Sequence, residues 1–432
     1  MRKFAIFLLL LAIAAGLLSM QLSRWREGTQ RQLQTVERQA QTLAAFARQE
    51  SALWTNDKAE KALSYRPKIE EQEAYAQFRS PEDILFLSES EAWDEEKLEL
   101  LYEELLRNRH GEELNTLEQV TVLAEEDEFA AATHRNTVQP VALAVRFPLF
   151  SKDAIVSLRQ YGGQITLYGG DRKTTVLEMA GELSHEYGHH YTLTYMLPGD
   201  GSFMDLQRDY AKLRGLDPET TLTARDDAEL YYENHKDYLV EIAAEDYVVL
   251  MGSPNAMADQ GDYIDIRDFK NGKTGDQWIL RNAAPQENMF LPFAADVPGL
   301  ADYFYGFLDE PAPEFPDASG AEPRFERHAV GYDLVGGYRT FVSYRVTWDK
   351  VLGEDATYTL ICLDPQTETL QPIKTVRAGE EAKAEIGELA VESGSRINYY
   401  EDGVTKGTKR FLVVVITPDG RAAVSDAVEK RF

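Results

Sequence analysis

The chain has 432 residues, 44% of them hydrophobic, with a formal net charge of −28 and a single cysteine, Cys362. This hydrophobic content is sufficient for two or three folded domains. The negative charge argues against nucleic acid or anionic lipid as a general partner, because both are polyanions. One cysteine excludes a disulfide within the chain.

The first predicted element is a hydrophobic segment, Phe4 to Leu22, which carries no charge and follows Arg2 and Lys3. As a helix it would span about 28 Å, close to the ~30 Å hydrocarbon thickness of a bilayer. We therefore predict a signal anchor in residues 1–25 and a single-pass membrane protein with an extracytoplasmic catalytic domain. The alternative is a cleaved signal peptide, for which Ala12-Ile13-Ala14 supplies small residues, and a secreted protein.

The next segment, residues 26–80, is rich in Gln, Arg, Ala and Glu, and its apolar residues recur at helical spacing. This pattern predicts a helical stalk or helices that pack on the following domain. A further helix is expected from Asp94 to Arg109, and a strand from Pro140 to Leu149. Residues 27–150 are also a candidate pro-segment.

Residues 185–189 read His-Glu-Tyr-Gly-His and fit the pattern HExxH. They lie in a proline-free run, Thr174 to Met196, with apolar residues at helical spacing, after a strand-like segment that ends at Gly169-Gly170. Side chains four apart lie on one face of a helix, so His185 and His189 can both reach one Zn²⁺, with Glu186 beside a metal-bound water. The alternative is a surface helix with two solvated histidines.

A catalytic zinc needs three protein ligands and one open position. The pattern HExxHxxGxxH is excluded, because Thr192 and Tyr195 stand where it requires Gly and His. A Glu from a later helix remains, and the best candidate is the run from Tyr238 to Leu250. Glu241 and Glu245 stand four apart on one face of that predicted helix.

In this arrangement Glu241 would be the third ligand, and Glu245 would hold an imidazole by its free ring N–H. Asp246 is a rival of Glu245 for that second role, and Glu245 is a rival of Glu241 for the metal. Gly188 costs helix stability relative to Ala, which indicates that another part of the chain lies close to the motif helix.

Over residues 160 to 260 or so, the chain resembles the gluzincin class of zincin metallopeptidases, the group that includes thermolysin. The resemblance implies His185, His189 and Glu241 as zinc ligands, Glu186 as general base and Glu245 as the group that orients an imidazole. Two positions differ from the usual pattern. Glu245 stands where Asp is common, and Glu182 stands where an uncharged residue is more frequent.

The resemblance also implies a mechanism. Zinc lowers the pKa of its bound water to about 7 and polarises the carbonyl under attack, and Glu186 passes the water's proton to the leaving amine. The oxyanion needs a further donor. The candidates are Tyr232, which stands nine residues before Glu241 as in thermolysin-like enzymes, and His235, followed by Tyr231 and Arg225. His190 is expected to pack or to face solvent away from the metal.

The last predicted boundary is residues 310–324, where four prolines among acidic or small residues indicate an extended linker. In residues 325–432 the apolar period changes to two, which predicts short strands. This part resembles a fibronectin type III or immunoglobulin-like β-sandwich in its strand spacing. Trp348 and Cys362 are expected to be core residues, and no chemistry is assigned to this domain.

Together these patterns predict an α+β fold class. A mainly helical zincin-like domain with a small sheet would occupy residues 81–309 and precede an all-β sandwich, with an N-terminal transmembrane helix. The predicted function is a membrane-anchored or secreted zinc metallopeptidase whose partners are a peptide or protein substrate and the membrane, with no nucleic acid. The alternative is a catalytically inactive zincin-fold protein for binding or adhesion at the cell surface.

Overall fold

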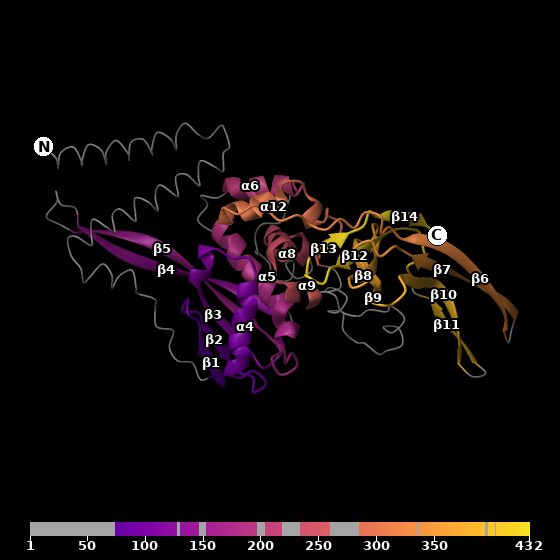
Figure 1. Cartoon of the computed structure of the whole chain (residues 1–432), viewed down its shortest axis with the longest axis horizontal. Helices are drawn as coiled ribbons and strands as arrows, with labels where there is room; N and C mark the ends of the chain where they lie inside the picture. The colour runs from indigo at the N-terminus through magenta and orange to yellow at the C-terminus, as the bar shows by residue number, and fades with distance from the viewer. Residues whose placement is uncertain are drawn as a thin grey trace. The chain divides into compact units, whose positions relative to one another are not determined.

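The computed structural model describes residues 74–127, 130–146, 153–196, 204–217, 234–259, 285–334, 337–393, 396–401 and 403–432. Contacts divide the chain into two units, residues 1–70 with 140–159 and residues 71–139 with 160–432. Of the first unit, the structure describes only residues 140–146 and 153–159, which belong to two strands. The second unit contains the other elements labelled in Figure 1.

Ahead of the C-terminal strands, the described residues form a five-stranded sheet in the order β1-β2-β3-β5-β4. Strand β1 is antiparallel to β2, whereas β2 and β3, and β3 and β5, are parallel. Buried apolar residues of β2, β3 and β5 join the core beneath the helices. The strands are β1 (Ala76–Arg79), β2 (Leu85–Ser88), β3 (Leu117–Val122), β4 (Ala132–Arg146) and β5 (Asp153–Leu167).

The structure confirms three of the predicted helices: the one that follows Asp94, the one that carries the HExxH motif and the one that follows Tyr238. Asp94 caps the first of them through the backbone N–H of Lys97, and Thr175 and Glu178 form a capping box on the motif helix. The helices are α4 (Glu95–Arg107), α5 (Val176–Tyr195), α6 (Met204–Leu213), α8 (Leu239–Met251), α9 (Pro254–Asp259) and α12 (Leu300–Tyr305). Short 3-10 segments are η1 (Glu112–Thr116), η2 (His235–Asp237), η3 (Ala294–Asp296) and η4 (Gly306–Leu308).

Helices α5 and α8 pack directly against each other, and Gly188 lies at their closest approach. A Cβ at Gly188 would lie 2.9 Å from the carbonyl oxygen of Ala244 and 3.1 Å from Cδ1 of Tyr247. The glycine that the sequence placed inside the motif helix therefore permits close contact with the helix that carries Glu241. This contact sets the distance between the two halves of the candidate site.

We expect Gly188→Ala to lower the free energy of unfolding by about 1–3 kcal/mol, because the added methyl group overpacks a backbone contact. Urea unfolding would measure the loss. Gly306→Ala is a matched control, since Gly306 has helical angles and no atom within 4 Å of a Cβ placed there. That control should be neutral or stabilising by about 0.4–1 kcal/mol. Equal effects of the two substitutions would contradict the close-contact argument.

The C-terminal part of the second unit consists of strands in the described residues from Arg324 onward. One sheet has the order β11-β10-β7-β6, and the other has the order β13-β12-β8-β9 with β14 paired to β12. The strands are β6 (Arg324–Leu334), β7 (Gly337–Thr347), β8 (Thr357–Asp364), β9 (Thr369–Val376), β10 (Lys383–Ser393), β11 (Arg396–Glu401), β12 (Thr408–Ile416), β13 (Ala422–Val424) and β14 (Val428–Arg431).

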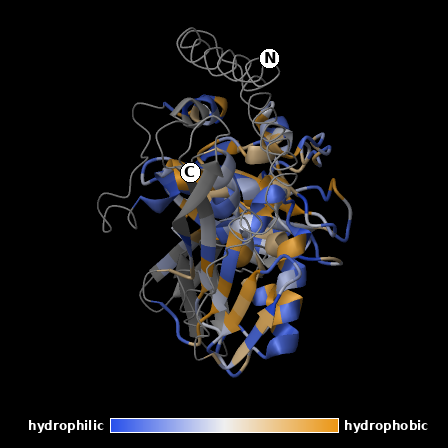
Figure 2. Ribbon diagram, turned by 90° about the vertical axis from the view of Figure 1, so that its left-hand side faces the viewer, coloured by the Kyte–Doolittle hydropathy of each residue, from blue (hydrophilic) through white to orange (hydrophobic). Residues whose placement is uncertain are grey.

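Both sheets contribute side chains to one core, so they form a β-sandwich. Trp348 and Cys362 are buried in this core, as expected. Strand β12 is apolar from Phe411 to Ile416, because both faces of this stretch are buried. Phe411, Val413 and Val415 face the sandwich core, while Leu412 and Val414 belong to the core that also contains α5 and α8. Figure 2, seen from the side of the N-terminal half, shows hydrophobic and hydrophilic residues mixed along the helices and strands that face the viewer.

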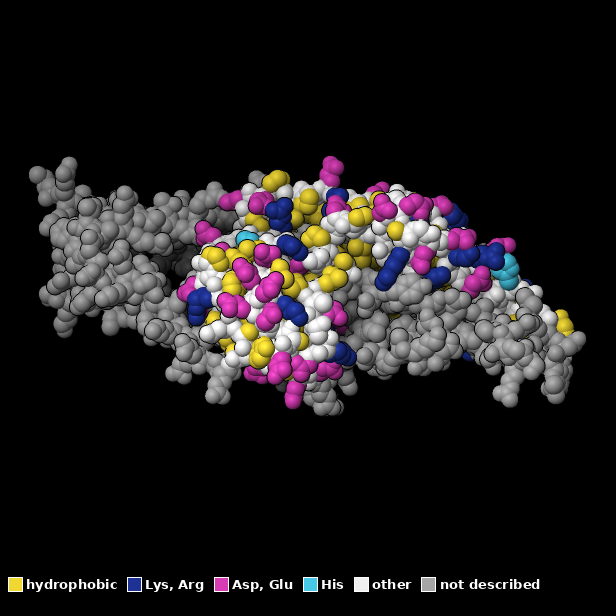
Figure 3. Space-filling model, turned by 60° about the horizontal axis from the view of Figure 1, so that its bottom comes forward, with side chains coloured by type: hydrophobic (Ala, Val, Ile, Leu, Met, Phe, Trp, Pro, Cys, Tyr) yellow, Lys and Arg dark blue, Asp and Glu magenta, His cyan; other side chains and the backbone are white. Residues whose placement is uncertain are grey.

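Acidic side chains outnumber basic ones in this chain, with 73 Asp and Glu against 45 Lys and Arg. On the face drawn in Figure 3, Asp and Glu side chains are spread among Lys and Arg. Several of these groups form exposed ion pairs, such as Arg324 with Asp349 at 2.6 Å. Exposed pairs of this kind contribute little to stability.

The predicted mainly helical domain with a small sheet is wrong. The described residues contain three sheets, and the one in the N-terminal half of the second unit has five strands. Strand β1 also lies at the end of the segment that was expected to be helical. The physical reason is that β2 is buried along its full length, and a buried run of only 4 residues carries no alternation from which a strand could be predicted.

The predicted membrane localisation also requires correction. Among the described residues, no helix is long and apolar enough to cross a bilayer. The longest of the helices given above, α5, has 20 residues but includes the charged and polar side chains of the HExxH motif. Within the described residues, the single-pass membrane assignment and the transmembrane helix of the predicted fold class therefore have no support. The predicted span, residues 4–22, lies outside the described residues, as do residues 27–73.

Candidate metal centre

The candidate metal centre lies where α5 and α8 meet. His185 and His189 are one turn apart on α5, and Glu241 lies in the first turn of α8. Nε2 of His185 is 3.3 Å from Oε2 of Glu241, and Nε2 of His189 is 3.0 Å from the same oxygen. One potential ligand atom from each residue lies within 4.8 Å of the other two. The group could hold a metal ion.

The donor set fits a divalent metal. With ligand bonds of about 2.0–2.1 Å, neighbouring donors of a tetrahedral zinc lie about 3.3 Å apart, close to both nitrogen–oxygen distances in this cluster. Nδ1 of His189 is buried and has no hydrogen-bond partner among the described residues. Because Nε2 of the same ring faces Glu241, Nδ1 lies on the outer side of the ring, away from the position that a metal ion would take.

The structure distinguishes between the two carboxylates proposed for the orienting role. Oε1 of Glu245 accepts a hydrogen bond from Nδ1 of His185 at 2.9 Å. Asp246 points elsewhere: it accepts a hydrogen bond from the hydroxyl of Tyr210 at 2.6 Å and forms an ion pair with Nε of Arg214 at 2.9 Å. Glu245 is therefore placed to orient His185, and Asp246 fastens α8 to α6.

The buried Asp246 provides a test by pH. Burial raises the pKa of Asp246 to about 6, although Arg214 and Tyr210 oppose the shift. Because the folded state holds this proton more tightly than the unfolded chain, its contribution to stability is present at low pH. It is lost between about pH 4 and about pH 6, by at most about 1.4 kcal/mol per pH unit.

We expect Asp246→Asn to remove this slope while also lowering stability at neutral pH, because Arg214 loses its buried partner. Urea unfolding of both proteins across that pH range would measure the two effects. Identical slopes for the variant and the unmodified chain would contradict the placement of Asp246.

Of the proposed oxyanion donors, the structure describes only His235. It lies in η2, directly before α8, with Nε2 3.1 Å from Oε2 of Glu241 and Nδ1 2.6 Å from Oε2 of Glu287. Its role as a donor to substrate stays a prediction. Tyr232, Tyr231 and Arg225 lie outside the described residues.

His185 and His235 each lie between two glutamate carboxylates, and these contacts shift the pKa values of the groups in the cluster. Burial alone would lower the pKa of His185, but Glu241 and Glu245 hold it well above its usual range. Burial would also lower the pKa of His235, but its contacts with Glu241 and Glu287 raise that pKa to about 10. Burial would raise the pKa of Glu241, yet the surrounding imidazoles hold it well below its usual range. The cluster therefore stabilises an ionised carboxylate deep in the protein.

Glu186 is buried beside these residues at 6% exposure. One helical turn earlier, Glu182 forms an ion pair with Lys173, so the charge that departs from the usual family pattern is compensated within the chain. Burial raises the pKa of Glu182, and Lys173 opposes that shift. Glu186 thus lies in a partly desolvated and acidic neighbourhood, next to the candidate ligands.

His190 is buried rather than solvated, and it holds α5 in place. Its Nε2 lies 2.9 Å from the carbonyl oxygen of Glu113. The carboxylate of Glu113 accepts hydrogen bonds from the hydroxyls of Tyr187 and Tyr195, each at 2.7 Å. Segment η1 therefore contacts the motif helix through the backbone carbonyl and the buried carboxylate of Glu113.

Two residues near the site were missed from the sequence, His134 and Glu287. His134 lies on β4, with its ring centroid 6.3 Å from that of His189 and its Nε2 3.4 Å from Nδ1 of His190. Gly163 on β5 provides the space, since a Cβ there would lie 2.3 Å from Nδ1 of His190. Neither missed residue belongs to a short motif, and only the fold brings each to the cluster.

Comparison of the chain with models of known protein families finds no match, and neither does a search of curated proteins. The gluzincin and fibronectin-like resemblances therefore stay predictions that rest on the residues of this chain.

Proposed function

We propose that this protein is a zinc-dependent peptidase with its active site at the junction of α5 and α8. The observation that carries the proposal is the convergence of His185, His189 and Glu241 from two helices, together with Glu186 buried beside them. Two imidazoles and one carboxylate leave a coordination position open, which is typical of catalytic rather than structural zinc sites. The choice of zinc follows from this donor set.

A zinc ion held by these three residues would supply Lewis-acid chemistry, activating water and polarising a carbonyl group. The residues of the chain have separate roles. Glu245 fixes the ring of His185 by accepting from Nδ1, so that Nε2 faces the site. Glu186 takes a proton from the attacking water and delivers it to the leaving amine, as a general base and then a general acid.

A peptide is the favoured substrate because a strand at the end of the sheet lies close to the cluster. Strand β4 stands at the end of the five-stranded sheet, and its His134 lies beside His189. An edge strand presents backbone N–H and C=O groups to which an extended peptide can pair. The same geometry would bring a peptide carbonyl toward the candidate ligands.

The alternative function is binding or adhesion without turnover, since a fold never establishes activity by itself. The β-sandwich favours this second candidate in one respect, because domains of that architecture commonly bind or space other domains. The two candidates differ in whether a bound metal is used for hydrolysis.

The deciding experiment combines metal analysis with a hydrolysis assay on the full chain. We expect about one zinc per chain, hydrolysis of generic fluorogenic peptides, loss of that activity with a chelator and its return with added zinc. A chain that binds zinc but never cleaves peptides would favour the binding protein. A chain that binds no divalent metal would refute the proposed site.

A further inference from the structure

His235 and Glu287 form a second imidazole–carboxylate pair on Glu241. Carboxylate oxygens only accept hydrogen bonds, so His235 donates from Nδ1 to Glu287 at 2.6 Å and from Nε2 to Oε2 of Glu241 at 3.1 Å. The side chain of Glu241 is 1% exposed, that of His235 is 26% exposed and that of Glu287 is 21% exposed. The pair therefore approaches a buried carboxylate from the more accessible side.

This pair has the same connections as His185 and Glu245. Each imidazole donates one ring N–H to a glutamate outside the cluster and directs its other nitrogen to Glu241. The difference is that His235 is not one of the three residues whose ligand atoms lie within 4.8 Å of one another. Two ligands of one zinc are at most about 4.2 Å apart, so His235 contacts a ligand without being placed as one.

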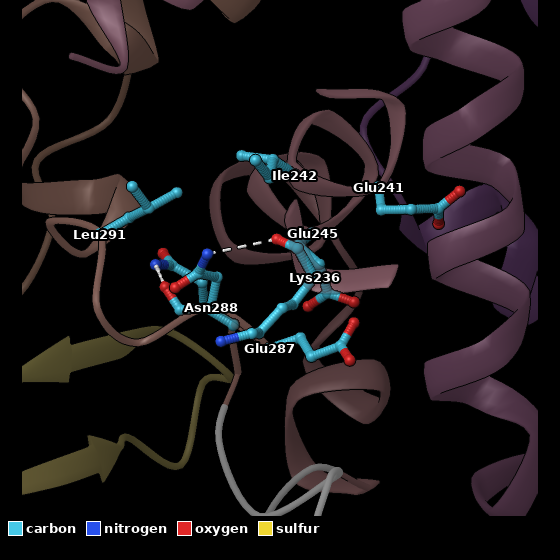
Figure 4. Close-up of a pocket in the computed structure, with 8 residues that line it drawn as sticks. Lys236, Glu241, Ile242, Glu245, Glu287, Asn288 and Leu291 are labelled. Atoms are coloured by element: carbon cyan, nitrogen blue, oxygen red, sulfur yellow. Dashed lines mark hydrogen bonds between the residues drawn. The ribbon is translucent and has the colours of Figure 1, made fainter. Parts of the chain in front are cut away.

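The segment that carries Glu287 is fastened to the segment that carries His235. Nδ2 of Asn288 donates to Oδ1 of Asp237 at 2.9 Å and to the carbonyl oxygen of Lys236 at 3.3 Å. Figure 4 shows Glu287, Asn288 and Lys236 around one recess, with the side chain of Glu241 directed toward the neighbouring helix. The Glu287–His235 contact is thus built into the fold and does not depend on two free side chains meeting.

We propose that His235, oriented by Glu287, is a positioning residue for the metal-binding carboxylate of Glu241. The hydrogen bond to Oε2 fixes the rotation of the carboxylate, so that one arrangement of its two oxygens is presented to a metal. Hydrogen bonds of this kind to ligand side chains raise metal affinity, typically by 10–100-fold. This inference rests on the metal site of the proposed function, but it assigns His235 to the metal ligand and not to the substrate.

The test is the zinc dissociation constant of the full chain, measured by competition with a chromophoric chelator. We expect His235→Ala and Glu287→Gln each to weaken zinc binding, by about 10–100-fold for His235→Ala. The double variant should be no weaker than His235→Ala, because Glu287 acts only through His235. Circular dichroism of the metal-free proteins checks that each variant is folded.

A matched control is available in the β-sandwich, where His328 and Glu326 form another histidine–glutamate pair at 3.5 Å. His328→Ala and Glu326→Gln should leave zinc affinity unchanged. The visible absorption of the cobalt-substituted protein should change in His235→Ala and not in His328→Ala, because only the former alters the carboxylate at the metal.

Zinc affinities within about twofold of the unmodified chain in both site variants would overturn the proposal. The same holds if the two substitutions are additive in the double variant. A fall in peptide hydrolysis with unchanged zinc affinity would assign His235 to the substrate and also overturn it. If the proposed function itself is wrong, the unmodified chain will bind no zinc. That outcome is distinguishable from the results above, in which the unmodified chain binds zinc.

Discussion

Glu186→Gln is expected to lower peptide hydrolysis by about 10²–10⁴-fold, the usual contribution of a general acid–base group. Glu186 is buried beside the candidate ligands but is not one of them. Gln keeps the size of the side chain and loses only its ability to accept and return a proton. The zinc content of the variant should therefore equal that of the unmodified chain.

The measurement is a comparison of kcat/KM for one fluorogenic peptide, with zinc content determined on the same samples. Glu182→Gln is a suitable control, since Glu182 lies one turn away on α5 and is paired with Lys173. It should retain most of the activity. A Glu186→Gln protein that cleaves peptides as fast as the unmodified chain would remove Glu186 from the mechanism.

Glu241→Ala is the second substitution with a large expected effect, and it should weaken zinc binding by more than about 100-fold. It removes one of three ligands, and it leaves the imidazoles of His185 and His189 without the carboxylate that both contact. Glu241→Gln preserves the size of the side chain but not its charge, so its zinc affinity should fall between those of Glu241→Ala and the unmodified chain. Competition with a chromophoric chelator measures each affinity.

Glu245→Ala provides the contrast, because Glu245 contacts only the outer nitrogen of His185 in the proposed arrangement. Its effect should lie in the range of about 10–100-fold that is usual for such partners. If Glu245→Ala abolished zinc binding while Glu241→Ala hardly changed it, the ligand would be Glu245 and the assignment of the two residues would be reversed.

The chemical part of the site could be predicted from the sequence, because it depends on spacing within single helices. His185 and His189 stand four apart on α5, and Glu241 and Glu245 stand four apart on α8, so each pair had to share a face. The sequence left open whether Glu245 or Asp246 holds His185. Adjacent residues on a helix point in different directions, and only the packing of α8 against α5 and α6 selects one of them.

Part of the sheet in the N-terminal half could not be predicted, because β1, β2 and β3 are short and the last two are largely buried. Strand β2 has 4 residues, and all of them are buried, so no alternation distinguishes it from part of a helix. Strand β12 shows the opposite case. Its run of β-branched residues predicted a strand, but only the tertiary structure shows that one face packs in the sandwich and the other against the helical core.

The sequence by itself determined the residue types and the local periodicity, and with them two helices that each carry half of the candidate metal site. The tertiary structure decided what meets those helices. Glu287, His134 and Glu113 are distant in sequence from the motif, and each reaches the site only because a loop, an edge strand or a 3-10 segment packs there. Local spacing fixes which side chains share a face, whereas contacts between distant segments depend on the burial of the whole core.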